Sequence, residues 1–220
     1  CRIEYARHLA APVAWEERRE IGRIRAWWRT TVDVTARPHL MYEAMPPRGE
    51  LGSAMSYGLI GSFMQSSTQL LCLAMYVVIL GMVGIAMVAS GSGADGWIML
   101  GVSGGMLFAV LLTPVIALFS FLLLAAFQHL ALLLVGAGKG GLEATLKVAC
   151  YAMGTGWVGV IPYFGAMIQP FWWTVLMVIG VGKVHRCSTT KSLVVLVPMV
   201  IACVAPVMAY VLIIVIAAVA

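Results

Sequence analysis

Charge is what this sequence has least of. Only 10% of its 220 residues are charged and 62% are hydrophobic, whereas soluble domains carry about 25% charged and about 45–50% apolar residues. This balance excludes an ordinary soluble protein and indicates an integral membrane protein. After residue 53 the charged side chains are Asp95, Lys139, Glu143, Lys147, Lys183, Arg186 and Lys191.

The uneven distribution of charge divides the chain. Residues 1–53 hold nine of the fourteen Lys and Arg residues and seven of the nine Asp and Glu residues. We therefore expect a polar leader over 1–53, cytoplasmic or at the membrane interface, and a helical membrane domain over 54–220. Because no apolar span lies in the leader, removal of residues 1–36 is expected to leave the membrane domain folded.

Reactive side chains are also scarce. The five cysteines form no CxxC pair, which predicts neither a disulfide framework nor a metal site. The loop GAGKGG lacks the spacing of a nucleotide-binding loop. The spacing of the reactive side chains along the chain matches no known catalytic cluster, so we predict no enzyme activity and no cofactor. In the leader, arginines alternate with Glu16, Glu17 and Glu20, which argues against a nucleic-acid-binding face.

Long apolar runs fill the rest of the chain. A helix needs roughly 20 apolar residues to cross about 30 Å of hydrocarbon. By this measure we predict an all-α protein with five transmembrane helices, preceded by a weaker apolar run from Ala54 that is helical and partly interfacial. The five crossings are expected at Leu70–Ser90, Met106–Val135, Leu142–Pro162, Tyr163–Val181 and Leu193–Val219.

A sixth crossing is the alternative, because residues 97–135 could hold two helices with a turn at Thr113-Pro114. Five crossings with the amino terminus inside place every Lys and Arg on one face, as the positive-inside rule favours. The protein is then expected in a bacterial inner membrane. Its inner-face basic residues would be Lys139, Lys183, His185, Arg186 and Lys191.

Residues 15–29 combine tryptophan with alternating charge. At helical spacing Ile21, Ile24 and Trp28 fall on one face. Trp side chains favour the headgroup level, so we expect a helix lying on the membrane surface or on a partner. A docked, solvated helix without a partner is the alternative. The expected contact residues are Trp15, Trp27, Trp28, Arg25 and Arg29.

Two other sets of residues have both a structural and a functional interpretation. Gln128 and His129 lie within an apolar span, where a polar residue either bonds to a neighbouring helix or serves a relay or ligand. Small residues allow close helix approach, within the chain or with a partner. The glycines with this expected packing role are Gly101, Gly105, Gly154, Gly156 and Gly159.

Several short motifs follow one another in a fixed order. They are His129 before the glycine-rich turn 135–141, Thr145 six residues before Tyr151-Ala152, Ile161-Pro162, Trp173, Ile179-Gly180-Val181 with His185, Lys191 and Pro198. Over about residues 37–206 this order resembles the Yip (Ypt-interacting-protein) domain family of five-helix membrane proteins. The amino-terminal run PVAWEERREIG, followed by ARPHLMYEAMP, is similar to that of its bacterial members. The resemblance implies vesicle traffic and contact with prenylated small GTPases for eukaryotic relatives, and no agreed activity for bacterial ones.

These observations favour a non-enzymatic membrane scaffold or accessory subunit. Its expected partners are other integral membrane proteins and anionic lipid, with no nucleic acid. A small transporter or channel is the alternative, although such a protein should show internal repeats and broken or charged helices at the midplane.

Overall fold

The computed structural model describes residues 13–161 and 164–219, which form helices and no strand. The prediction of an all-helical chain is thus confirmed for these residues. In chain order the elements are α2 (Arg18–Ile21), α3 (Arg23–Ala36), α4 (Pro38–Ala44), α5 (Leu51–Ala89), α6 (Gly93–Leu134), α7 (Leu142–Ala152), the 3-10 helix η1 (Met153–Val160), α8 (Phe164–Val184), α9 (Thr189–Ser192), the 3-10 helix η2 (Leu193–Val195) and α10 (Leu196–Val219).

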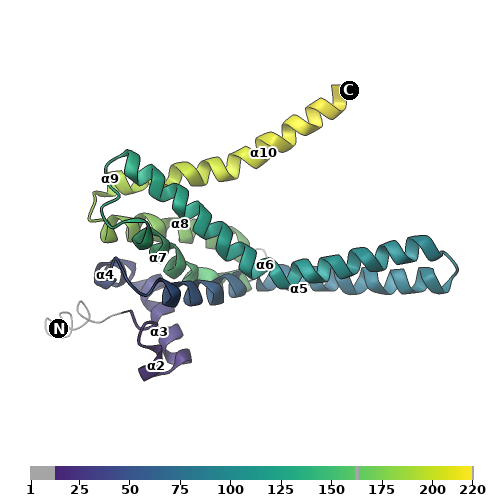
Figure 1. Cartoon of the computed structure of the whole chain (residues 1–220), viewed down its shortest axis with the longest axis horizontal. Coiled ribbons are helices and arrows are strands. Elements are labelled where there is room, and N and C mark those ends of the chain that lie inside the picture. Colours follow the sequence, from purple (N-terminus) through teal and green to yellow (C-terminus); the bar gives the residue numbers. More distant parts are fainter. Residues whose placement is uncertain (1–12, 162–163, 220) are drawn as a thin grey trace.

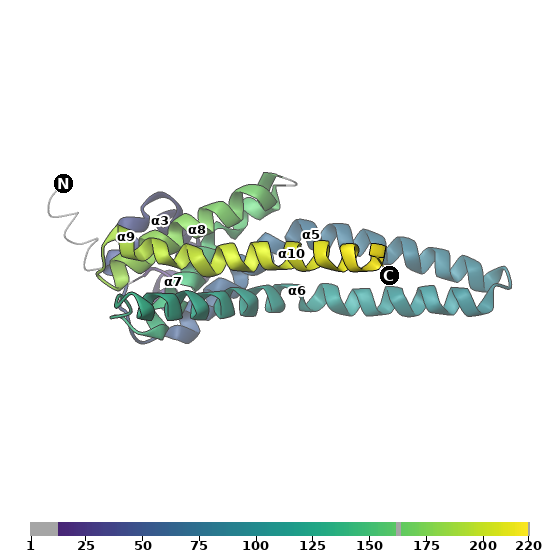
Figure 2. The ribbon, with the colours of Figure 1, turned by 90° about the horizontal axis from the view of Figure 1, so that it is seen from above.

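Helices α5 and α6 form a long antiparallel hairpin whose tip projects beyond the other helices (Figures 1 and 2). They contain 39 and 42 residues, or about 58 and about 63 Å at a rise of about 1.5 Å per residue. The Ser62 hydroxyl donates to the Pro114 carbonyl at 3.0 Å, and that of Ser103 to the Val77 carbonyl at 2.9 Å. These bonds fix the register of the two helices.

The hairpin decides between one and two helices over residues 97–135. Helix α6 continues through Pro114 without a turn. A proline within a helix leaves the carbonyl four residues earlier without its usual partner. This carbonyl is that of Val110, and the helix continues past it. The carbonyl of Pro114 itself accepts a hydrogen bond from Ser62. The alternative with a turn at Thr113-Pro114 is therefore not the structure that forms.

Element η1 packs against α5 at backbone contact. A Cβ atom added at Gly156 would overlap the Gly61 carbonyl, and one at Gly159 would lie 2.7 Å from the Gln65 Cα. One at Gly154 would overlap the Tyr57 hydroxyl. No larger residue fits at Gly156 or Gly159, where two backbones approach this closely, or at Gly154, which lies against the Tyr57 side chain.

Gly101 and Gly105 differ from those three. Both are exposed on α6, and a Cβ atom at either position would meet nothing within 4 Å. Their expected packing within the chain is not what the structure shows. The interpretation that stays open for them is contact with a partner or with lipid.

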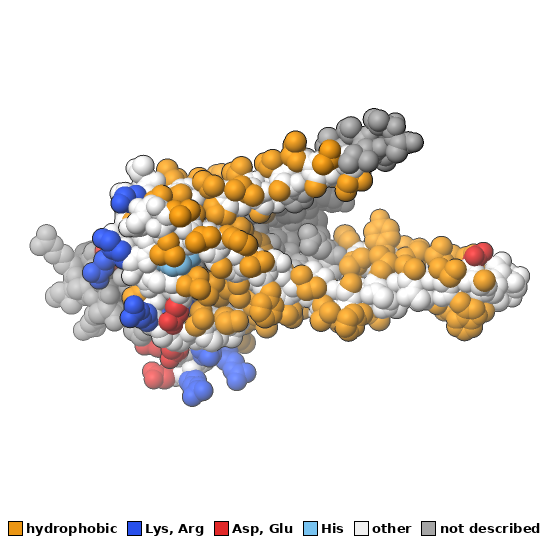
Figure 3. Space-filling view, turned by 45° about the horizontal axis from the view of Figure 1, so that its top comes forward, with side chains coloured by type: hydrophobic (Ala, Val, Ile, Leu, Met, Phe, Trp, Pro, Cys, Tyr) orange, Lys and Arg blue, Asp and Glu red, His pale blue; other side chains and the backbone are white. Residues whose placement is uncertain are grey.

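Charge gathers at one end of the molecule. Lys and Arg side chains lie at the end opposite the hairpin tip (Figure 3), whereas Asp95 lies in the first turn of α6 at that tip. In the described part of the chain three helices are long and apolar enough to cross a membrane, and this fits a multi-pass protein. They are Leu70–Ala89, Gly93–Leu134 and Met167–Val184.

One buried apolar cluster joins the leader to the membrane helices. It runs from Trp15 and Val34 through Tyr57 and Tyr151 to Trp173. The division of the chain into leader and membrane domain at residue 53 stays a prediction. The buried cluster contains residues from both sides of this boundary.

Alanine substitutions at two glycines test the contact between α5 and η1. Gly156→Ala should lower the thermal stability of the protein in detergent, because its Cβ would overlap the Gly61 carbonyl. Gly105→Ala should leave the melting temperature unchanged or raise it slightly, because nothing lies near that site and Ala suits a helix interior better than Gly. Equal effects of the two substitutions, measured by a melting curve in the same detergent, would contradict the assigned α5–η1 contact.

Candidate functional site

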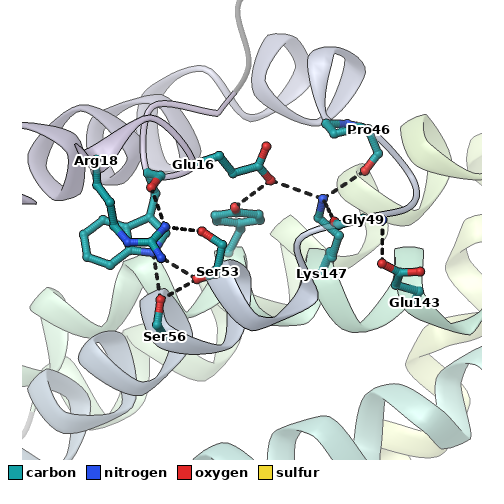
Figure 4. A network of polar contacts seen from close by, with 10 residues as sticks. Glu16, Arg18, Pro46, Gly49, Ser53, Ser56, Glu143 and Lys147 are labelled. Carbon is teal, nitrogen blue, oxygen red and sulfur yellow. Dashed lines mark hydrogen bonds and ion pairs between the residues drawn. The ribbon is translucent and has the colours of Figure 1, made fainter. Parts of the chain in front are cut away.

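The most buried charge in the described structure is the ammonium of Lys147, whose side chain is fully covered. It lies on α7 and faces the leader (Figure 4). Its Nζ is 3.2 Å from the Glu16 Oε1 and donates to the carbonyls of Pro46 at 3.1 Å and Gly49 at 2.8 Å. An ammonium has three protons to donate. Two hydrogen bonds and one ion pair thus hold this ammonium, and all three partners precede α5.

The carboxylate of Glu16 balances this charge. Its side chain is only 9% exposed, and its Oε1 also accepts a hydrogen bond from the Tyr151 hydroxyl at 3.0 Å. Gly49, at φ 87°, forms two hydrogen bonds to α7. Its N–H donates to the Glu143 Oε1 at 2.6 Å, and its carbonyl accepts from Lys147. The leader is therefore held to α7 at Glu16 and again at residues 46–49.

Trp15 lies inside this assembly. Its indole Nε1 donates to the Ser53 carbonyl at 2.9 Å and the Ser56 hydroxyl at 3.0 Å, and its ring meets Tyr57 edge-on at 5.7 Å. The Arg18 guanidinium lies over the indole at 5.2 Å and bonds to the Ser53 hydroxyl. Trp15 is 4% exposed, so the structure does not leave it free for the membrane or partner contact expected from the sequence.

Helix α3 presents the remaining expected contact residues. Trp28 is 61% exposed, Arg25 and Arg29 are also exposed, and Trp27 is half-buried. Gly22, at φ 87°, separates α3 from α2, which moves Ile21 onto another helix. The outer stripe is therefore Ile24, Trp28 and Val32.

The opposite face of α3 is anchored. Ala26 and Val34 are fully buried. The Thr30 hydroxyl accepts from the Trp15 backbone N–H at 2.9 Å, and the hydroxyls of Thr31 and Tyr57 lie 2.9 Å apart. The outer stripe is therefore carried on a helix that is bonded to the rest of the molecule.

Two histidines meet through a threonine where α6, α7 and α8 come together. The Gly140 backbone N–H donates to the His185 Nδ1 at 2.9 Å. This leaves the neutral ring with its proton on Nε2, which donates to the Thr145 Oγ1 at 2.9 Å. The Thr145 hydroxyl then donates to the His129 Nδ1, also at 2.9 Å. The sequence placed the three residues near the same membrane face but did not show that they join.

His185 is 1% exposed and differs from its expected role as a basic residue of the inner face. Burial, and next the nearby His129, lower the pKa of His185 from 6.5 to about 4, so it is neutral at pH 7. Lys139, Arg186 and Lys191 are exposed as expected, and Lys183 forms an exposed ion pair with Glu43 at 3.0 Å.

Gln128 joins α6 to η2, because its Nε2 donates to the Val195 carbonyl at 3.1 Å. Both polar residues expected within the α6 span therefore bond to neighbouring elements. Within residues 13–161 and 164–219, no group of three or more His, Cys, Asp or Glu side chains could hold a metal ion.

Sequence reasoning missed the ion pair of Lys147 and Glu16. A signal was present, because Lys147 is a single cation inside the stretch 142–162 expected to cross the membrane, and such a residue requires a partner. Nothing in the spacing identified Glu16 as that partner, since 131 positions separate the two residues along the chain.

Comparison with family models matches residues 63–219 to the Yip1 domain. Comparison with curated proteins and with solved structures gives no match.

The ion pair can be tested by removing its acid. Glu16→Gln should lower the free energy of unfolding by about 3–5 kcal/mol, because it leaves a buried ammonium without its counter-charge. Glu43→Gln breaks an exposed pair as a matched control and should change it by about 1 kcal/mol or less. Denaturation of both variants in the same detergent measures this. Equal losses would contradict a special role for Lys147, and Lys147→Met should partly restore Glu16→Gln.

The histidine pair predicts a pH effect. Since the pKa of His185 falls from 6.5 to about 4 on folding, the unfolded chain binds more protons between these values. Stability from neutral His185 is therefore fully present above pH 6.5 and lost as the pH falls toward 4, by about 1.4 kcal/mol for each unit of pKa difference. His185→Gln should flatten this part of the stability curve. His39→Gln, at an exposed site, should leave it unchanged.

Proposed function

Since the chain belongs to the Yip1 domain family, a family of non-enzymatic membrane proteins, we propose that it is a membrane scaffold or accessory subunit without catalytic activity. Its partners would be other membrane proteins that it holds at the charged end of the molecule. The family relationship supports membrane-associated partners in general, and the surface of α3 suggests where they bind.

The observation that carries the proposal is the outer stripe of α3, formed by Ile24, Trp28 and Val32. Ile24 is 85% exposed and Trp28 is 61% exposed, although the opposite face of the same helix is buried. Trp and Arg are the residues most enriched at binding hot spots, and exposed Arg25 and Arg29 flank the stripe. A rigid helix with this surface suits recognition by a partner.

The side chains that could act as acids or bases in catalysis are hydrogen-bonded to other parts of the fold. The Lys147 ammonium is hydrogen-bonded to two carbonyls and paired with Glu16, and the His185 ring is bonded through both nitrogens. A shallow groove on α5 is lined by apolar residues such as Leu71 and Met75. These features favour a binding role over catalysis, and over the transporter alternative, which would require a polar path.

We further propose that the charged end faces the cytoplasm of a bacterial cell, with the amino terminus inside. The exposed cations Lys139, Arg186 and Lys191 follow the ends of α6 and α8, and Figure 3 shows Lys and Arg side chains gathered at the end opposite the hairpin tip. The positive-inside rule and attraction to anionic headgroups both favour this orientation.

The proposal is tested by co-purification from native membranes in a mild detergent. An Ile24→Ser/Trp28→Ser variant should lose its co-purifying proteins at least tenfold, because truncation of a Trp hot spot costs about 2 kcal/mol or more. Trp97→Ser is the matched control, since Trp97 is 66% exposed at the opposite end of the molecule. Equal retention by both variants at equal monodispersity would exclude α3 as the binding surface.

A further inference from the structure

Elements α7, η1 and α8 occupy the place of the third and fourth expected crossings. Helix α7 has 11 residues and η1 has 8. They rise about 17 Å and about 16 Å respectively. Their sum matches about 30 Å of hydrocarbon only if α7 lies within the bilayer along its whole length.

The leader prevents α7 from entering that far. Glu16 binds Lys147 and also Tyr151, which is the tenth of the eleven residues of α7. The residues that follow Glu16 include the charged stretch 17–20, of which Arg19 and Glu20 are exposed. Exposed charges are not placed in hydrocarbon. Only η1, about 16 Å long, therefore extends past the charged leader.

Helix α5 gives an independent measure of depth. Thr31 of α3 bonds to Tyr57, and Gly159 near the end of η1 lies against Gln65. These two positions on α5 are eight residues apart, or about 12 Å. Beyond Gln65, α5 continues to Ala89 for a further 24 residues, or about 36 Å. The η1–α8 end thus stops well short of the hairpin tip.

Helix α8 starts at this same depth. A Cβ atom at Gly165 would overlap the Val158 carbonyl and lie 2.9 Å from the Gly159 Cα. At its other end Lys183 pairs with Glu43 of α4. Although residues Met167–Val184 are long and apolar enough to cross a membrane, part of this length lies beside the leader.

The end of this short hairpin is apolar. No charged residue occurs between Lys147 and Lys183, and Gly156 and Gly159 are buried against α5. The rim that remains exposed consists of Trp157, Val160, Ile161, Phe164, Met167 and Ile168.

We propose that α7, η1 and α8 form a re-entrant hairpin, whose apolar rim contacts the acyl chains of the inner leaflet and does not reach the outer face. The inference rests on the proposed orientation with the amino terminus inside. It leaves α5, α6 and α10 as the crossings, so the basic loops 136–141 and 182–192 stay inside. A hairpin that occupies one leaflet would also give the protein a means of shaping lipid.

Cysteine accessibility tests the proposal on the full chain, with the five native cysteines first replaced by Ser and monodispersity confirmed. Single cysteines at Ser92, Ile161 and Ser188 are exposed to a membrane-impermeant maleimide in intact cells and then in permeabilised cells. Ser92→Cys should react from outside, and Ser188→Cys only after permeabilisation. Ile161→Cys should react at least tenfold more slowly than either, on both sides.

A photo-crosslinker at Phe164 supplies the positive result, because it should attach to lipid acyl chains in nanodiscs, whereas one at Ser188 should not. Outside labelling of Ile161→Cys at the rate of Ser92→Cys would overturn the proposal in favour of full crossings. Labelling of Ile161→Cys at the rate of Ser188→Cys after permeabilisation would overturn it by placing the hairpin in water. Outside labelling of Ser188→Cys would instead refute the orientation, and none of these results depends on partner binding.

Discussion

The ammonium of Lys147 is the constraint on which the arrangement of the leader depends. A buried charge is costly unless it is paired and fully hydrogen-bonded. Here every acceptor comes from residues 16–49, so α7 can bury its lysine only if the leader is in place. Such a pair adds little net stability over apolar packing. Its effect is to fix one position of the leader, and with it the stripe carried by α3.

This constraint changes the expectation that the leader can be removed. No apolar span lies in residues 1–36, and helix packing in lipid is set mainly by the spans. Removal of that segment would nevertheless take away Glu16 and leave Lys147 without its counter-charge, and it would uncover Tyr57 and Tyr151. The charged segment is therefore part of the folded unit in the structure, although its composition alone marks it as separate.

The sequence predicted the ranges of α8 and α10 closely, but not the start of α6, the division between α7 and η1, or the contacts between helices. Apolar runs and glycine or proline residues at their ends are local features, so α8 and α10 lie close to the predicted ranges. Contacts such as that of Trp15 with Ser53, or of Gly156 with Gly61, join distant positions. Gly105 and Gly156 have similar surroundings in sequence, and only the fold shows that one is open and the other is covered.

The α5–α6 hairpin is longer than a membrane crossing requires. At about 63 Å, α6 is about twice as long as the hydrocarbon is thick. In the proposed orientation the near half of the hairpin lies beside the charged leader at the membrane surface, and the apolar far half is long enough to cross. The molecule thus has a base held together by buried polar bonds and an arm of largely apolar side chains, in which the Ser103 hydroxyl bonds to the Val77 carbonyl. The proposed recognition of partners fits the base, because there the fold holds polar and aromatic groups such as Trp15, Arg18 and Tyr57 in fixed positions.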